Sequence, residues 1–352
     1  MNGEESRHAG ARQSHHRQAS EDVNRERRTT RRACGLLVAL ALVALTGTSV
    51  GCGGDQIATG EGLRVVTSAG FLADLAGNVA GDRAVVSSLI PPDTSPHGFE
   101  PTPSDLRAVA AADLVVLNGA GLEEGLADAM REAGGDTPVV EAAAGLPPRT
   151  PQPGEPAHEH ESEDEGEHED GGEHEGAVDP HFWLDPTLAV RYIETIRDAL
   201  IEVDPAGAGA YETNAAAYIA ELDELDRWIA EQIETIPPAD RLLVMNHVSH
   251  GYFADRYGLR IAGAVTPSVS SGDMPSARDL AELTATIRAT GVKAIFVDIG
   301  ENPELSRQIA RETGVLVVDD LRTHALSEEG GGAETYIEML RHDTRRIVEA
   351  LR

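Results

Sequence analysis

Metal-binding chemistry is indicated near the middle of the chain, where the octapeptide DPHFWLDP at residues 179–186 follows a run of histidines and carboxylates. The octapeptide contains His181, and the run contains four further imidazoles, His158, His160, His168 and His174. Residues 151–178 carry almost no apolar side chains to bury, so we expect a disordered, solvated loop that binds metal through these histidines.

His181 alone would be weak support for a metal site, because a single histidine is often a satisfied core residue. Under that interpretation the Asp-Pro pairs mark turns and helix boundaries, and Phe182 and Trp183 are core residues. Three further candidates, His97, His247 and Asp319, occupy comparable positions in the chain. The metal hypothesis therefore depends on their convergence.

Composition limits the function classes. The 352 residues are enough for two domains, and a hydrophobic content of 41% is normal for a globular protein. The net charge of -31 argues against nucleic acid as a partner, because binding phosphates needs a basic face, and it suits cations or cationic surfaces.

Residues 1–52 have the layout of an export signal, with arginines followed by an apolar run too short to span a bilayer comfortably. The pair Arg31-Arg32 leaves twin-arginine and ordinary secretion both open. The alternative for the segment is a disordered tail and a buried helix. SVGC at residues 49–52 resembles a lipoprotein lipobox, although Ser49 replaces the usual Leu. We expect lipid on Cys52, against plain secretion, then a flexible tether at residues 53–62. Cys34 would leave with the signal, so the mature chain would have no disulfide.

The remainder predicts an α/β fold with two lobes, each a parallel sheet flanked by helices. The first lobe spans residues 63–150 and ends with 179–204; the second spans 237–352. Expected strands are 63–67, 84–90, 113–117 and 137–140, then 241–245, 259–265, 293–298 and 315–318. Expected helices are 71–80, 104–112 and 123–132, then 252–257, 276–289, 303–313 and 333–351.

Residues 205–236 carry apolar side chains three or four positions apart, which predicts one long amphipathic linker helix ended by Pro237-Pro238. A coiled-coil seam between two copies would give a similar pattern. With a lobe on each side, we favour a rigid rod packed along both lobes of a monomer.

Three candidates are expected at carboxyl ends of strands, where open parallel sheets bind ligands. His97 follows the strand ending at residue 90, His247 follows residues 241–245, and Asp319 follows residues 315–318. His181 lies in the crossover before the rod. Two candidates thus come from each half of the chain, as a site between two lobes requires.

Four sequence blocks also resemble the metal-site blocks of the solute-binding proteins of zinc and manganese ABC importers, in the same order. They are PHGFEPTPSDL at 96–106, the octapeptide, His247 with GYFADRYGL at 251–259, and VDDL at 318–321. The resemblance covers about residue 63 to the C-terminus. It implies two α/β lobes with a rigid connecting helix, and a metal held between them for delivery to a membrane permease.

By this resemblance the metal ligands would be His97, His181, His247 and Asp319, with Asp320 a competitor for the last position. Ser95 and Val248 stand where the family often has acidic residues, but neither change removes a ligand. We interpret His250 as a surface histidine, with a supporting role beside the site as the alternative.

Three imidazoles and one carboxylate suit tetrahedral zinc, whereas manganese prefers an oxygen-rich octahedron. In manganese-type relatives the third ligand is usually a carboxylate, so His247 favours zinc. The histidine-rich loop also favours zinc, since its imidazoles and carboxylates would raise the local concentration of cations. The alternative is that the loop is a solvated spacer that only aids solubility.

The predicted function is capture of Zn²⁺ outside the cytoplasm and delivery to an ABC permease, with a zinc chaperone as a possible further partner. Alternatives are a manganese or iron carrier of the same family and a zinc-sequestering or adhesin lipoprotein. A zinc hydrolase is disfavoured, because four protein ligands would close the position that water needs. The chain also lacks His-Glu-x-x-His, Gly-x-Ser-x-Gly and a convincing phosphate loop.

Overall fold

The computed structural model describes residues 62–97, 99–123, 125–152, 155, 178–266 and 274–352. The described residues belong to one compact unit, Glu61–Arg352. The predicted signal, the lipidation site Cys52 and the four histidines of the predicted loop lie outside the described residues, so those expectations stay predictions.

The first lobe is a parallel four-stranded sheet in the order β2-β1-β3-β4. Its strands are β1 (Leu63–Thr67), β2 (Ala84–Ser88), β3 (Leu114–Leu117) and β4 (Val139–Glu141), and its helices are α2 (Gly70–Ala80), α3 (Pro103–Ala110), α4 (Gly125–Gly134) and α5 (Pro186–Val203). Val65 and Val116 face the cluster that contains α2 and α5, whereas Val66 and Val115 face α3 and α4. This alternation buries both faces of the sheet, as in other parallel sheets.

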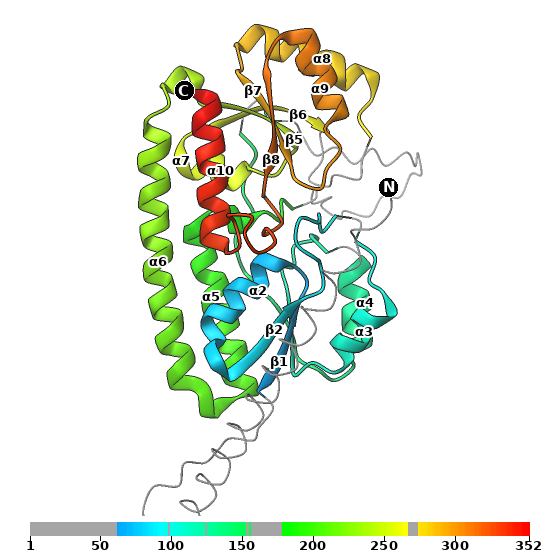
Figure 1. Cartoon of the computed structure of the whole chain (residues 1–352), viewed down its shortest axis with the longest axis vertical. Helices are drawn as coiled ribbons and strands as arrows, with labels where there is room; N and C mark the ends of the chain where they lie inside the picture. Colours follow the sequence, from blue (N-terminus) through cyan, green and yellow to red (C-terminus); the bar gives the residue numbers. More distant parts are fainter. Residues whose placement is uncertain (1–61, 98, 124, 153–154, 156–177, 267–273) are drawn as a thin grey trace, which may run out of the picture. The chain divides into compact units, whose positions relative to one another are not determined.

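The second lobe repeats this plan in the order β6-β5-β7-β8. Its strands are β5 (Leu242–His247), β6 (Arg260–Thr266), β7 (Ala294–Asp298) and β8 (Leu316–Leu321), and its helices are α7 (Gly251–Tyr257), α8 (Ala277–Thr290), α9 (Glu304–Thr313) and α10 (Tyr336–Leu351). The capping box of Ser276 and Asp279 starts α8, and Gly291 in the left-handed conformation ends it. The predicted α/β class with two parallel sheets is confirmed (Figure 1).

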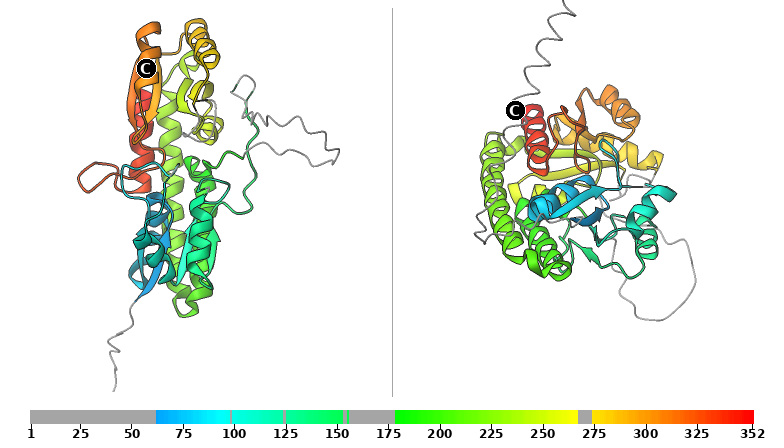
Figure 2. Two further views of the ribbon diagram at one scale, coloured as in Figure 1. Left: turned by 90° about the vertical axis from the view of Figure 1, so that its right-hand side faces the viewer. Right: turned by 60° about the horizontal axis from the view of Figure 1, so that its bottom comes forward.

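A single long helix, α6 (Ala208–Glu234), follows α5 and precedes the second sheet. Its 27 residues correspond to about 40 Å. It is shorter than predicted, because Pro205–Gly207 form a 3₁₀ turn before it. It packs against α2 and α5 of the first lobe and against α7 and α10 of the second. Figure 2 shows α6 beside α10 from two further directions.

The buried face of α6 belongs to one apolar cluster that continues into both lobes. Tyr218, Leu222 and Leu225 lie in the same cluster as Val65 of β1 and Phe296 of β7. Separating the lobes widely would therefore expose core side chains to water, at about 25 cal/mol for each Å² of apolar surface.

In the second sheet, β5 and β8 extend beyond their predicted ends, which changes where the candidate ligands lie. β5 continues to His247, so the histidine is the last residue of the strand. β8 continues to Leu321, which places Asp319 and Asp320 inside the strand instead of after it. Among the described helices, none is long and apolar enough to cross a membrane.

Candidate metal site

Four histidine side chains from both lobes converge at the carboxyl ends of the strands. His97 lies in the loop after β2, His181 precedes the 3₁₀ turn Phe182–Leu184, His247 ends β5, and His324 follows β8. One ring nitrogen of each lies within 4.8 Å of the others. The structure thus brings together His97, His181 and His247 from the predicted set, and adds His324.

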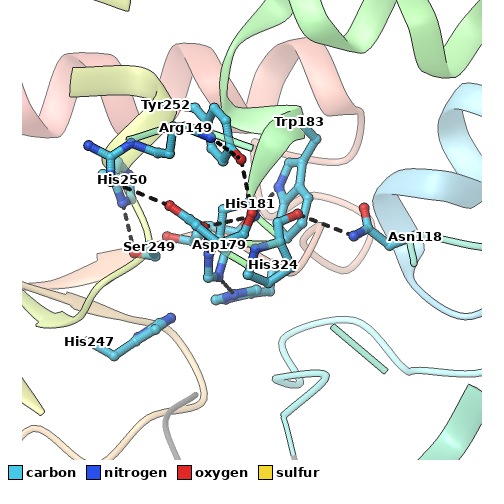
Figure 3. Close-up of polar contacts among 12 residues, drawn as sticks. Asn118, Arg149, Asp179, His181, Trp183, His247, Ser249, His250, Tyr252 and His324 are labelled. Carbon is cyan, nitrogen blue, oxygen red and sulfur yellow. Dashed lines mark hydrogen bonds and ion pairs between the residues drawn. The ribbon is translucent and has the colours of Figure 1, made fainter. Parts of the chain in front are cut away.

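His181 is fully buried and is oriented by the preceding acidic residue. Its Nδ1 lies 2.7 Å from Oδ1 of Asp179, and its backbone N–H donates to the same oxygen at 3.0 Å. A carboxylate that accepts from Nδ1–H leaves the lone pair on Nε2, the nitrogen that points toward the cluster. That Nε2 lies 2.9 Å from Nε2 of His324 (Figure 3).

The turn that carries His181 is supported from the first lobe. Asn118, which follows β3, donates from Nδ2 to the carbonyl oxygen of Pro180 at 3.2 Å. Tyr192 of α5 donates to Oδ1 of Asn118 at 2.7 Å, which fixes the orientation of the amide. The position of His181 therefore depends on buried polar contacts as well as on the strand ends.

His247 is held by two carboxylates. Its Nδ1 lies 3.0 Å from Oε1 of Glu301 and 3.5 Å from Oδ2 of Asp298, the last residue of β7. Burial alone would lower the pKa of His247, but Glu301 and then Asp298 outweigh burial and raise that pKa above its ordinary value. Asp298 is itself fully buried, and burial raises the pKa of its carboxyl to about 7.

His324 is fixed by the two residues before it. The carbonyl oxygen of Thr323 accepts from Nε1 of Trp183 at 2.8 Å, and the Thr323 hydroxyl donates to Asp298. Arg322 forms an ion pair with Asp93 of the first lobe. Burial, and then the neighbouring imidazoles, hold the pKa of His324 well below its ordinary value, so the ring is neutral.

His97 completes the cluster from the first lobe. Its ring centroid lies 5.4 Å from that of His247 and 4.9 Å from that of His324. Burial, and then His247 and His181, lower the pKa of His97 to about 3. The Nε2 atoms of His97 and His247 are both buried without a hydrogen-bond partner among the described residues, which is unusual unless a ligand such as a cation fills the site.

The structure does not bring Asp319 to this cluster. Its carboxylate is exposed on β8 and pairs with Arg307 of α9 at 2.7 Å. The competing candidate Asp320 pairs with Arg346 of α10 at 2.9 Å. Because β8 runs to Leu321, both carboxylates lie along an edge strand and reach arginines on the flanking helices. The fourth side chain of the cluster, and so the candidate for the fourth metal ligand, is therefore His324.

His250 also differs from its expected place on the surface. It is only 1% exposed, directly before α7, with Nδ1 3.0 Å from Oγ of Ser249 and its ring against Phe253. Burial lowers its pKa to about 3. It is a neutral core histidine close to the site rather than a surface residue.

Sequence reasoning missed His324, Asp298 and Glu301. Asp298 ends a predicted strand, so the strand-end rule applied to Asp319 would also have selected it. The signal for His324 was weaker. It lies beyond the end of β8, and that strand includes Asp319 and Asp320, which were expected to follow it. Glu301 needed the tertiary contact to His247 to be recognised.

The arrangement suits a divalent cation. Each imidazole offers a nitrogen lone pair in its neutral form, and Glu301 and Asp298 lie behind His247 in a second potential metal-binding group. Such carboxylate–imidazole pairs orient a ligand ring and raise its basicity. Fold and site together define a two-lobed metal-binding protein.

Residues 65–350 match the family model described as "Zinc-uptake complex component A periplasmic". The chain is 34% identical over 319 residues to the manganese-binding lipoprotein MntA of Halalkalibacterium halodurans, covering 90% of this chain and 97% of the relative. It is 30% identical over 309 residues to the iron-binding protein YfeA of Yersinia pestis, covering 88% and 93%. The solved periplasmic zinc binding protein TroA of Treponema pallidum aligns with a TM-score of 0.70 at 25% identity, covering 82% of this chain and 99% of TroA.

The chain belongs to this zinc-uptake component A family. Several streptococcal relatives are named manganese or metal ABC transporter substrate-binding lipoproteins. The family consists of extracytoplasmic solute-binding components of metal importers rather than enzymes, and the family resemblance inferred from the sequence is confirmed.

Proposed function

We propose that this protein captures Zn²⁺ outside the cytoplasm, on His97, His181, His247 and His324, and delivers it to an ABC permease. The observation that carries this proposal is the convergence of four imidazoles within 4.8 Å of one another. Zinc readily takes four nitrogen ligands in a tetrahedron, whereas manganese favours oxygen ligands. Anchoring through Cys52 would keep the protein beside its permease.

A manganese or iron cargo is the second candidate, and two observations favour it. The carboxylates of Asp298 and Glu301 form a potential oxygen-rich group with His247. The relatives MntA and YfeA are named as manganese- and iron-binding proteins. For either of those cargoes, a carboxylate would have to replace an imidazole as ligand.

Transfer to the permease would require strain at the ligands rather than wide lobe opening. The cluster takes residues from both lobes, so a small relative shift changes all four ligand positions. The apolar cluster along α6 resists a large rotation. Comparison of apo and metal-loaded crystal structures tests this, and a wide rotation between the lobes would contradict it.

The cargo is tested by competition titration against a chromophoric chelator with Zn²⁺, Mn²⁺ and Fe²⁺. One tight zinc equivalent, lost in His181→Ala and His324→Ala, is expected. The matched control is His342→Ala, since His342 lies on α10 and contacts the carbonyl oxygen of Asp320. Tighter binding of manganese than of zinc would transfer the proposal to the second candidate.

The role proposed for the histidine-rich loop is accessory capture of zinc by His158, His160, His168 and His174. Deleting residues 156–175 tests it, because this deletion keeps Glu155 and Asp179. One tight equivalent should survive the deletion, while additional weak equivalents are lost. If tight binding disappeared with the loop and survived His181→Ala, the protein would be a zinc-sequestering lipoprotein instead.

A further inference from the structure

Arg149 lies buried at the junction between the two lobes, and the metal-binding chemistry above gives it no role. Its side chain is 4% exposed, and it reaches from the segment after β4 to α7 of the second lobe. Nε donates to Oδ2 of Asp255 at 2.9 Å, and Nη1 and Nη2 donate to Glu155 at 2.7 and 2.8 Å. Such a forked, buried arrangement is highly directional.

The same guanidinium also lies close to the residue that orients His181. Nη1 is 3.8 Å from Oδ2 of Asp179, whose other oxygen, Oδ1, contacts Nδ1 of His181 at 2.7 Å. Asp179 therefore stands between a buried cation and a proposed metal ligand (Figure 3). The Arg149 guanidinium thus contacts Glu155, which precedes residues 156–177 in the chain, and lies close to Asp179, which follows them.

Tyr252 of α7 joins the same contacts by a second route. Its hydroxyl donates to the backbone carbonyl oxygen of Asp179 at 3.1 Å and accepts from the backbone N–H of Arg149 at 3.3 Å. Arg149 thus holds both the carboxylate and the backbone of Asp179, one directly and the other through Tyr252.

The backbone of α7 leaves room for this side chain only because residue 251 is glycine. A Cβ at Gly251 would lie 2.5 Å from Cζ of Arg149, closer than any real contact. The guanidinium would have to move, and its contacts with Asp255 and Asp179 would change together. The substitution Gly251→Ala would therefore displace the Arg149 guanidinium without removing its charge.

We propose that Arg149 is a positioning residue for the metal site, which ties the segment after β4 to α7 and holds Asp179 against His181. This inference rests on the proposed function. Metal-binding histidines depend on such supporting carboxylates, and loss of this support typically weakens binding by about 10- to 100-fold. Arg149 does not touch the metal in this account; it acts only through Asp179.

The test uses the full chain in four forms: unchanged, Arg149→Met, Arg149→Lys and Gly251→Ala. Zinc affinity and the visible absorption of the Co²⁺-loaded protein are measured, because the Co²⁺ bands report ligand geometry and not stability. We expect about tenfold weaker zinc binding and altered Co²⁺ bands in Arg149→Met and Gly251→Ala. Arg149→Lys should restore part of both, since one ammonium group keeps the charge but not the fork.

The matched control is Arg256→Met. Arg256 lies on α7, the helix that also carries Gly251 and Tyr252. It pairs with Asp226 of α6, and not with Asp179, through two contacts of 2.9 and 2.6 Å. The Arg256→Met variant should be less stable than the unchanged protein, but its Co²⁺ bands should not change. Unchanged bands and affinity in both Arg149→Met and Gly251→Ala would overturn the inference alone. Failure of the unchanged protein to bind Zn²⁺ or Co²⁺ would instead overturn the proposed function.

Discussion

The Nε2 atoms of His181 and His324 lie 2.9 Å apart, although 143 residues separate them in the chain. Two ligands of tetrahedral zinc at about 2.0–2.1 Å from the metal are roughly 3.3 Å apart. The pair is therefore close to the separation that zinc requires, and a small outward movement of either ring would admit the ion. His181 and His324 come from different parts of the chain, so metal binding would join those parts directly.

Replacing His324 should change the metal preference. In His324→Asp an oxygen ligand replaces a nitrogen, so we expect zinc affinity to fall at least tenfold and the ratio of manganese to zinc affinity to rise. Competition titrations with both metals measure that ratio. A ratio equal to that of the unchanged protein would mean that His324 does not contact the ion.

Asp319→Asn and Asp320→Asn should leave metal affinity unchanged. Both carboxylates are 43% exposed and pair with arginines on flanking helices, so each substitution should alter the free energy of unfolding by at most about 1 kcal/mol. Urea unfolding and zinc titration of the two variants check this. A large loss of affinity in Asp319→Asn would restore Asp319 as a ligand.

Metal binding should be linked to the proton on His247. Glu301 and Asp298 raise the pKa of His247 above its ordinary value, so the metal-free ring keeps its proton to a higher pH than an ordinary histidine does. A bound metal must displace that proton. Affinity should therefore rise with pH and level off above that pKa. Glu301→Gln removes one of the two carboxylates, so the rise should move to lower pH. Calorimetry in buffers with different ionisation enthalpies measures the protons released. An affinity that rises with pH but without any proton release on metal binding would contradict this assignment.

The fold was largely predictable because its strands are continuous apolar runs. LVVL in β3 and AIFVD in β7 are buried on both faces, and a parallel sheet between helices is the arrangement that buries such runs. Helix starts with capping residues, such as Ser276 before α8, were similarly readable. The pattern could not show that both sheets share one apolar cluster along α6, because that is a property of tertiary packing.

The site was only partly predictable, and the difference lies in one strand. The expected strand ended at residue 318, and the consecutive acidic residues Asp319 and Asp320 that follow are disfavoured in strands by propensity. On this edge strand each pairs with an arginine on a neighbouring helix, and the strand continues to Leu321. The residue that joins the histidine cluster is then His324, beyond the strand. Tertiary partners of this kind cannot be read from local sequence.

Trp183 connects the packing of the core to the position of His324, which gives a final prediction. The indole is fully buried, stacks on Phe71 with ring centroids 4.4 Å apart, and donates from Nε1 to the carbonyl oxygen of Thr323. In Trp183→Phe that carbonyl loses its donor and a cavity opens beside it. We expect a loss of about 2–4 kcal/mol in the free energy of unfolding, together with weaker zinc binding.

The matched control is Trp228→Phe. Trp228 lies half-buried on α6 and contacts Arg341 and Arg345 of α10, each with its guanidinium carbon 5.5 Å from the ring centroid. This variant should lose less stability and keep its zinc affinity. Urea unfolding and zinc titration of the two variants separate the effects, because a general loss of packing would not by itself move His324. Equal zinc affinities in Trp183→Phe and Trp228→Phe would show that the indole contact does not position that ligand.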